Sequence, residues 1–512
     1  MHRSGNMIRI AKTESGLVQG IEAADPRITA FKGIPFAKPP VGENRWRAPK
    51  PCEHWEGVKE CFRFAPIGMQ DTPGLGEDIY CREWHVDPKI AMSEDCLYLN
   101  IWTGAKSTDE KQPVLVWFFG GALQWGYPSE MEFDGERLAR RGIVVVTINY
   151  RLNVFGFLAH PELTRSQPEA PTNFGNLDQQ AALQWVIRNI KAFGGDDRNI
   201  TIAGQSAGGG SVMSQLVCPS NKGSFQKAVV ASGMIKSPYG ECMIEPAISL
   251  EKAEKLGKRF FDYLGVKGLE EARRLDATYL LHKYSKFVQT HPRMFTCVDD
   301  RFCVGDPTHL FLQGKHVEVP ILAGNTADEF PNSIVAETKE DYRKKVHELF
   351  GEQADTFLGF KEAWEKDEDN HYASVSGIEC TVKSIFLSNE KQKNPKDCYY
   401  YCFDAEIPGW DHPGTFHSVD LWFFFETLAK CWRPFTGKHY DLSRLMCNYW
   451  ANFIKSGNPN GDDADGSPMP KWTPYTTKTP CSMIFSTDGV RQREEESEFH
   501  QFLIQKITRE NE

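Results

Sequence analysis

The sequence predicts an α/β fold built on a large, mostly parallel β-sheet with helices packed against it. Three observations carry this prediction: two apolar runs at 113–119 and 143–149, an amphipathic helical pattern over 178–193, and a third apolar run at 199–203. Apolar runs without alternation are typical of strands that are buried on both faces, as in parallel sheets. Because these runs alternate with helical sequence, we expect crossover connections between parallel strands of one sheet.

The stretch 199–217 has the strand–turn–helix pattern around which this sheet is organised. Its apolar run leads into Gly204-Gln205-Ser206-Ala207-Gly208, after which small and then apolar residues continue. A G-x-S-x-G turn holds its serine in a strained backbone conformation, and its glycines let strand and helix approach each other. Ser206 is therefore a candidate nucleophile at a helix N-terminus, where the N–H of Ala207 faces a developing oxyanion. The alternative is a Gly/Ser-rich loop, which the flanking strand and helix argue against.

The remaining elements follow in chain order. Alternating apolar and polar residues at 7–34 are typical of antiparallel edge strands, and a proline-rich loop runs from 33 to 73 or beyond. A strand is expected within 93–102, and a charged helix near 135–141 connects the first two central strands. Further sheet strands are predicted at 227–232, 319–323 and 398–403.

Two segments of charged helical sequence, at about 240–315 and 333–396, interrupt the strand pattern. No flexible linker bounds either segment, so we expect helical lid or regulatory insertions over one face of the sheet rather than separate domains. The chain 1–512 is therefore predicted to form a single domain.

The composition is that of a globular protein with a substantial core, since 40% of the 512 residues are hydrophobic and 25% are charged. A net charge of −10 argues against nucleic acid and anionic membrane surfaces as partners. The N-terminus lacks the apolar segment of a signal peptide, and no run approaches the length of a membrane helix. The 14 cysteines are scattered without C-x-x-C pairs, so we expect no zinc site, no disulfide framework and a cytoplasmic protein.

A serine nucleophile requires a base, a group that orients the base, and an oxyanion hole. In this sheet topology the order along the chain is Ser, then Asp or Glu, then His. Asp328 and Glu329 follow the strand predicted at 319–323, and His417 lies in a later loop before an aromatic run. The oxyanion hole is expected at Gly120-Gly121-Ala122, where small residues let backbone N–H groups approach a substrate oxygen.

With these residues in place, the chain resembles the type-B carboxylesterases, the α/β-hydrolase family that includes cholinesterases and bacterial para-nitrobenzyl esterases. The resemblance spans residues 31–425, and its matching motifs are FKGIPFAKPPVG, RWRAPKP, SEDCLYLNIW, VLVWFFGGALQWG, INYRLNVFGFL, GNLDQQAALQWVIRNIKAFGGD, GQSAGG, GNTADE and GTFHSVDLWFFF. It implies an α/β-hydrolase fold with helical insertions over the active site. It also implies hydrolysis of carboxylic esters to acid and alcohol through an acyl-enzyme.

The resemblance also implies roles for individual residues. Ser206 is expected as the nucleophile, Glu329 as the acid of the triad and His417 as the base. The family register favours Glu329 over Asp328, and the following Ser-Val-Asp-Leu favours His417 over His412. The implied oxyanion donors are Gly121, Ala122 and Ala207, and the candidates for the substrate pocket are Trp125, Trp422 and Phe423.

The chain departs from the family pattern at several positions. Phe119 stands where the family usually has His, and Ala122 replaces a third glycine, although either change leaves a backbone N–H. Gln205 replaces the Glu that often precedes the serine, which we expect to remove a buried charge without touching the triad.

The cysteines also depart from the pattern of the family's secreted members. Those members bridge the Cys of the SEDCLYLN segment, here Cys96, to a Cys whose place is taken by Gly68. Cys61 and Cys81 are the alternative partners. The substitution favours a reduced, bacterial-type protein.

Family register also predicts two ion pairs in apolar surroundings, Arg45–Glu94 and Arg151–Asp178. An unpaired buried charge costs several kcal/mol, so each Arg is expected to be paired if it is buried. The alternative is that each Arg is a solvated surface residue.

These observations together predict a serine carboxylesterase that acts on a small-molecule ester without a cofactor or metal, as a monomer or weak homo-oligomer. Two other classes are a scaffold or adhesion protein on the same fold and an acyltransferase or lyase that uses the same triad. The presence of Ser206, Glu329 and His417 argues against the scaffold.

Overall fold

The computed structural model describes residues 7–240 and 247–510 of the chain. The strands of its central sheet are β3 (Ile21–Glu22), β4 (Thr29–Pro35), β6 (Tyr98–Thr103), β7 (Gln112–Phe118), β8 (Val144–Ile148), β9 (Gly195–Gln205), β10 (Lys227–Ala231), β13 (Ile321–Thr326), β16 (Cys398–Phe403), β17 (Ser482–Ser486) and β18 (Gly489–Arg493).

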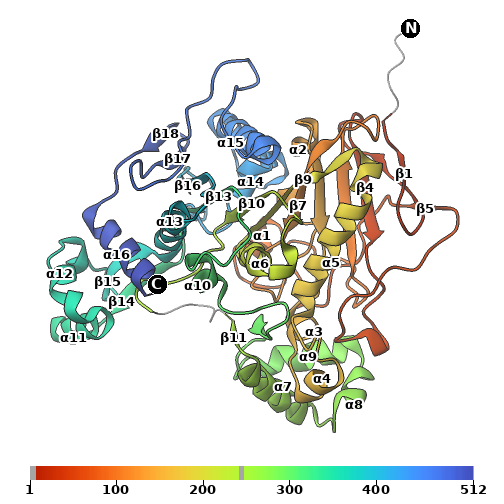
Figure 1. Ribbon diagram of the computed structural model, residues 1–512, viewed down its shortest axis with the longest axis horizontal. Helices are drawn as coiled ribbons and strands as arrows, with labels where there is room; N and C mark the ends of the chain where they lie inside the picture. The colour runs from red at the N-terminus through yellow and green to blue at the C-terminus, as the bar shows by residue number, and fades with distance from the viewer. Residues whose placement is uncertain (1–6, 241–246, 511–512) are drawn as a thin grey trace.

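Within the described ranges these 11 strands lie in the order β18-β17-β16-β13-β10-β9-β7-β8-β6-β4-β3. Figure 1 shows the sheet running across the molecule from β18 and β17 on the left to β4 on the right. Neighbours from β17 through β8 are parallel, while β18 and the strands from β6 to β3 pair antiparallel at the two ends. The predicted α/β class with a mostly parallel sheet is therefore confirmed. The central strands are buried along their whole length, as their continuous apolar sequence indicated.

Helices cover both faces of the sheet. The helices nearest to it are α2 (Glu136–Arg140), α5 (Phe174–Asn189), α6 (Ala207–Val217), α10 (Pro307–Leu312), α13 (Gly377–Glu390), α14 (Leu421–Phe424), α15 (Gly437–Ser456) and α16 (Glu498–Arg509). On one face α5, α6, α10, α13 and α16 contact one another in sequence, and α2, α14 and α15 form the other layer.

An aromatic seam joins β7 to the layer of α14 and α15. The ring of Trp117 lies 4.9 Å from the ring of Phe425, and Phe424 stacks on Trp450 at 4.2 Å. All four side chains are fully buried, so much of the high aromatic content of the chain belongs to the core.

Smaller elements lie around this framework. Three short sheets are formed by β1 (Ile10–Lys12), β2 (Leu17–Gln19) and β5 (Val58–Glu60), by β11 (Ile248–Ser249) and β12 (Cys297–Val298), and by β14 (Pro331–Val335) and β15 (His371–Ser376). The other helices are α1 (Tyr80–Glu83), α3 (Asn153–Phe157), α4 (Pro161–Ser166), α7 (Leu250–Leu264), α8 (Leu269–Arg273), α9 (Ala277–Phe287), α11 (Lys339–Phe350) and α12 (Ala354–Leu358). Figure 1 shows α7, α8 and α9 grouped at the bottom of the molecule and α11 and α12 at its left.

Both predicted ion pairs are present and buried. Arg45 Nε lies 2.5 Å from Glu94 Oε1, and Arg45 Nη1 also donates to the carbonyl oxygen of Leu275 at 2.7 Å. Arg151 donates two hydrogen bonds to the Asp178 carboxylate, from Nε to Oδ2 at 2.8 Å and from Nη2 to Oδ1 at 2.7 Å. The two side chains are 2% and 0% exposed. The first pair ties the proline-rich loop to the segment before β6, and the hydrogen bond from Arg45 to Leu275 links the same loop to the α7–α9 group. The second pair fixes the first turns of α5 against the end of β8.

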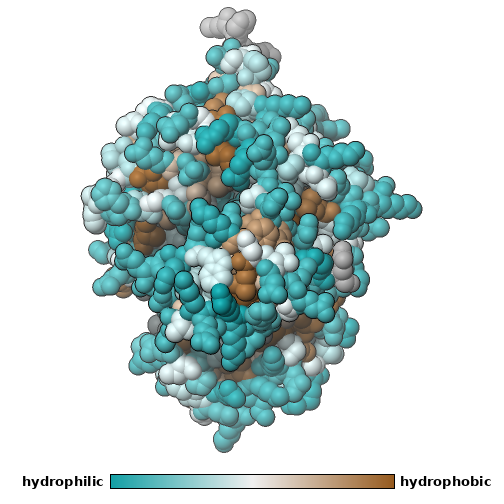
Figure 2. Space-filling view, turned by 90° about the vertical axis from the view of Figure 1, so that its left-hand side faces the viewer, coloured by the Kyte–Doolittle hydropathy of each residue, from teal (hydrophilic) through white to brown (hydrophobic). Residues whose placement is uncertain are grey.

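The surface carries its hydrophobic residues in small separate patches on the face shown in Figure 2, which is otherwise mostly hydrophilic. Over the described residues, we find no helix with both the length and the apolar character needed to cross a bilayer.

Candidate active site

Ser206 lies at the sharp turn between β9 and α6. Its backbone has φ 56° and ψ −125°, a strained conformation for a residue with a side chain. A Cβ at Gly204 would lie 2.3 Å from the carbonyl oxygen of Gly208, and one at Gly208 would lie 2.1 Å from that of Phe118. Both glycines are therefore required by the close approach of strand and helix.

Glu329 and His417 lie together near this turn. Glu329 follows β13 by three residues, and His417 lies in the loop between β16 and α14. His417 Nδ1 is 2.7 Å from Glu329 Oε2, and the two side chains are 7% and 1% exposed. The other carboxylate oxygen, Oε1, accepts hydrogen bonds from the hydroxyls of Ser232 and Thr326.

The pair is polarised by its surroundings. Burial opposes a charge on His417, but the adjacent Glu329 carboxylate outweighs this and raises the pKa of His417. Burial also opposes the charge on Glu329, while His417 and the hydroxyl donors together lower the pKa of that carboxyl. Glu329 is thus held as a carboxylate that accepts a hydrogen bond from the Nδ1–H group of His417.

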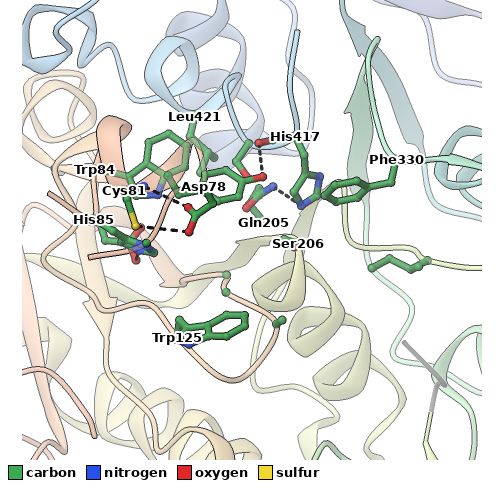
Figure 3. Close-up of a pocket in the computed structure, with 18 of the residues that line it drawn as sticks. Asp78, Cys81, Trp84, His85, Trp125, Gln205, Ser206, Phe330, His417 and Leu421 are labelled. Carbon is green, nitrogen blue, oxygen red and sulfur yellow. Dashed lines mark hydrogen bonds and ion pairs between the residues drawn. The ribbon is translucent and has the colours of Figure 1, made fainter. Parts of the chain in front are cut away.

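Nε2 of His417 contacts Gln205, a residue that was expected not to touch the triad. Gln205 Nε2 lies 3.3 Å from His417 Nε2, as Figure 3 shows. Among the residues that the structure describes, Ser206 Oγ makes no hydrogen bond to the imidazole of His417. The expectation that Gln205 leaves the triad untouched is therefore wrong, because its side chain folds over the elbow toward the histidine.

The glycine loop after β7 lies against the elbow. A Cβ at Gly121 would lie 2.2 Å from the carbonyl oxygen of Trp125, so this position requires glycine. Ala122 has a φ of 54°. In the described ranges, no hydrogen bond to another protein atom is made by the N–H groups of Gly121, Ala122 and Ala207. Before this loop, Phe119 stacks its ring on Tyr150 at 4.3 Å, which accounts for an aromatic residue there.

Two cavities meet at Ser206. The larger has a volume of about 800 Å³ and is lined by aromatic side chains that include Trp84, Trp125 and Phe330 (Figure 3). The smaller, of about 120 Å³, lies on the α6 side and is lined by small residues such as Gly210 and Gly233. A reacting group at Ser206 therefore has space on both sides.

Two contacts of His417 were missed by sequence reasoning. Tyr80 Oη donates to the carbonyl oxygen of His417 at 3.1 Å, and the ring of Phe330 lies 4.7 Å from the imidazole. Phe330 directly follows Glu329 and could have been suspected from that position. Tyr80 begins the short helix α1, which lies within the stretch expected to be a long loop, and its sequence carries no such signal.

Two of the pocket predictions are wrong. Trp422 and Phe423 are fully buried and belong to the core, whereas Trp125 does line the larger cavity. Although they lie close to His417 in sequence, α14 turns their side chains inward. Trp422 Nε1 donates to the buried Glu83 carboxylate at 3.1 Å, and the ring of Phe423 packs against Phe403 at 4.8 Å.

The two rival residues have other places in the structure. Asp328 Oδ2 accepts hydrogen bonds from the N–H of Thr415 at 2.8 Å and from its hydroxyl at 3.1 Å. It therefore fastens the loop that carries His417. His412 lies in an exposed turn with φ 44°.

The three cysteines considered for a disulfide form none among the described residues. Cys96, Cys61 and Cys81 are free thiols. A Cβ built on Gly68 would lie 3.6 Å from Cys96 Sγ, so Gly68 does face the thiol that the family bridges.

One group of potential metal ligands occurs in the described part of the chain, at Glu379, Glu496 and His500. The ammonium of Lys383 already lies 2.5 Å from Glu379 and 2.6 Å from Glu496. These side chains thus form a partly buried ion-pair network around the fully buried Lys383, whose charge offsets the carboxylates.

The fold and this site match one family of hydrolases. The model of the carboxylesterase family matches residues 8–502. The chain therefore belongs to the carboxylesterase family, and it is a carboxylic ester hydrolase with the α/β-hydrolase fold.

Similar proteins include bacterial and animal esterases. The para-nitrobenzyl esterase of Bacillus subtilis (strain 168) is 31% identical over 97% of this chain and 98% of its own length. The acetylcholinesterase of Bungarus fasciatus is 30% identical over 93% of this chain and 82% of its own. Among solved structures, a PNB esterase superposes with a TM-score of 0.76 at 28% identity, covering 97% of this chain and 100% of the other. A Geobacillus stearothermophilus carboxylesterase gives 0.75 at 29% identity, covering 97% and 99%.

Proposed function

We propose that this chain hydrolyses carboxylic esters through an acyl-enzyme in which Ser206 is the nucleophile, His417 the general base and acid, and Glu329 the orienting carboxylate. The hydrogen bond between His417 Nδ1 and Glu329 Oε2, beside a strained serine that opens on two cavities, is the observation that carries the proposal. The strain at Ser206 and the burial of the pair favour a reactive site over a structural one.

The proposed reaction follows from the protonation of this pair. Since Nδ1 keeps its proton and donates a hydrogen bond to Glu329, Nε2 carries a lone pair and can accept the proton of Ser206 Oγ. As Oγ forms a bond to the ester carbon, the carbonyl electron pair moves to oxygen. The imidazolium then returns its proton to the leaving alcohol as the C–O bond breaks. Water repeats the sequence and releases the acid.

The negative charge that develops on the carbonyl oxygen needs donors that have no other partner. The N–H groups of Gly121, Ala122 and Ala207 meet this requirement in the part of the chain that the structure describes. The N-terminus of α6 adds its partial positive charge at Ala207. We therefore assign these three donors to the oxyanion hole.

The two cavities suit an ester, which extends on both sides of the carbon that is attacked. Ser206 and Ala122 border both spaces, so the acyl and alcohol halves have separate room. The lining of both cavities is more apolar than polar, which favours apolar or aromatic substituents, although Asp71 and Asp78 also line the larger one.

The proposal is tested with para-nitrophenyl acetate and the Ser206→Ala variant. We expect kcat to fall by about four decades, because the covalent step is lost. An organophosphonate should label wild-type Ser206 and leave the variant unlabelled. Near-normal turnover by Ser206→Ala would refute the proposal, and recovery of a transferred acyl group in place of free acid would favour an acyltransferase.

A further inference from the structure

We infer that Gln205 is a positioning residue that holds His417 through Nε2 in the free enzyme and favours the neutral form of the base. The inference rests on the proposed function, since it concerns the base of the same site. It goes beyond it because Gln205 neither reacts nor belongs to the triad.

The direction of the hydrogen bond follows from the tautomer of the ring. His417 Nδ1 is 2.7 Å from the Glu329 carboxylate, which can only accept, so Nδ1 carries the proton. Nε2 of the neutral ring is then an acceptor. At 3.3 Å from Nε2, the amide group of Gln205 meets it as a donor through Nε2–H.

The side chain of Gln205 has little freedom to leave this place. It is 3% exposed, and it fills the space beside Gly120, where an added Cβ would lie 3.1 Å from Gln205 Oε1. Glycine at 120 thus leaves room for the amide between the glycine loop and the imidazole. In this position the amide occupies the lone pair that Ser206 must use, so the hydrogen bond has to open before proton transfer.

The effect of Gln205 on His417 differs in sign from the effects of the charged groups around the imidazole. Glu329 favours the imidazolium and raises the pKa of His417, and Asp420 acts in the same sense. Asp420 is itself buried, which raises its pKa to about 7. Tyr80 contacts only the backbone oxygen of His417. Among these groups, Gln205 is uncharged and donates a hydrogen bond to His417 Nε2. Such a donor stabilises the neutral imidazole, because the protonated Nε2 could no longer accept it.

An amide has an advantage over a carboxylate at position 205. The amide donates to the neutral ring through Nε2–H, and after reorientation it can accept from the imidazolium through Oε1. An ionised carboxylate can only accept, so it would favour the charged ring and block the base at low pH. The side chain therefore determines how far activity extends toward acid.

The test is the pH profile of kcat/KM for para-nitrophenyl acetate in Gln205→Met and Gln205→Glu. Gln205→Met removes the donor, and the acid limb should move to higher pH by about half a unit. Gln205→Glu adds a charge as well, and the shift should reach about one unit. Plateau values should stay within about tenfold of wild type after active-site titration with an organophosphonate.

Gln289→Glu is the matched control, because it adds the same charge at an exposed position. The acid limb of its pH profile should coincide with that of the wild type. An acid limb that stays in place in Gln205→Met would overturn the inference, even if Gln205→Glu shifts, because charge alone would then explain the shift. A plateau loss without a shifted limb would likewise mean a structural role. An inactive wild type would instead contradict the proposed function.

Discussion

Replacing Gly68 by Cys should create a disulfide with Cys96 in a protein whose described cysteines are free thiols. A Cβ built on Gly68 lies 4.0 Å from the Cβ of Cys96, within the range of about 3.5–4.5 Å that disulfides occupy. The nearest atom outside Cys96 is the carbonyl oxygen of Tyr150, also at 4.0 Å, so a Cβ at this position meets no clash. Gly68 does not have the positive φ that would penalise a larger residue.

The stabilisation follows from the loop that the bridge closes. Residues 68 and 96 enclose about 28 residues, for which the chain-entropy relation gives about 3.5 kcal/mol. The unfolding entropy of a chain of 512 residues is about 1.1 kcal/mol/K, so the melting temperature should rise by about 3 °C. The reference is the same variant in its reduced form.

The assay compares oxidised and reduced Gly68→Cys by thermal melting, with Gly68→Ser as the control that lacks a thiol. Burial raises the pKa of Cys96, which slows thiolate exchange, so the bridge is best formed during refolding in a glutathione buffer. Thiol titration in denaturant should count two fewer thiols in the oxidised sample. Equal thiol counts would refute the geometry, and equal melting temperatures with the bridge formed would refute the entropic reasoning.

Two further predictions concern the carboxylates. Glu329→Gln should lower kcat by about three to four decades, because the base loses its charged partner, whereas Asp328→Asn should stay within about tenfold, since the Asp328 carboxylate accepts hydrogen bonds from Thr415 rather than from His417. The reverse order of the two variants in an esterase assay would exchange their roles. Asp178→Ala should lose roughly 3–5 kcal/mol of unfolding free energy in urea, because it strands the buried Arg151. A loss below about 1 kcal/mol would mean that the pair is not needed for stability.

The core of the fold was accessible from sequence because its strands are continuous apolar runs. The strand predicted at 398–403 coincides with β16, and the predicted strand–turn–helix arrangement around Ser206 is present, although β9 (Gly195–Gln205) is longer than the strand predicted at 199–203. The strands β17 and β18 were not predicted. Residues of β18 are exposed or half-buried along its length, so its sequence carries no buried face to read.

Helix α15 was also not predicted, although a signal exists. Leu442, Met446, Tyr449 and Phe453 are buried at helical spacing. The residues between them are mostly apolar or uncharged, with Arg444 as the one charged residue, so the apolar face is not sharply marked in the sequence. Their contacts with the sheet, which decide which face is buried, come from strands far away in sequence.

The sequence located the backbone positions of the site, but it could not show where the neighbouring side chains point. Trp422 follows His417 by five residues, yet its partner is Glu83 on α1, more than three hundred positions earlier. The contact of Gln205 with His417 depends in the same way on a side-chain conformation that a sequence motif does not encode. The motif fixes the place of the backbone, and packing decides where each side chain points.

Whether each buried carboxyl of the site is ionised depends on the hydrogen bonds that it accepts, rather than on the number of acidic residues nearby. Glu329 accepts from His417, Ser232 and Thr326 and remains ionised. Asp420 accepts from Tyr401 Oη at 2.8 Å, but its Oδ1 is buried and has no partner among the described residues. Its carboxyl is therefore protonated more readily than that of Glu329, as the pKa of about 7 indicates. A third carboxylate at position 205 would face His417 without comparable donors and would favour the imidazolium. With an amide there, one firmly ionised carboxylate faces the imidazole, and the base can stay neutral at a lower pH.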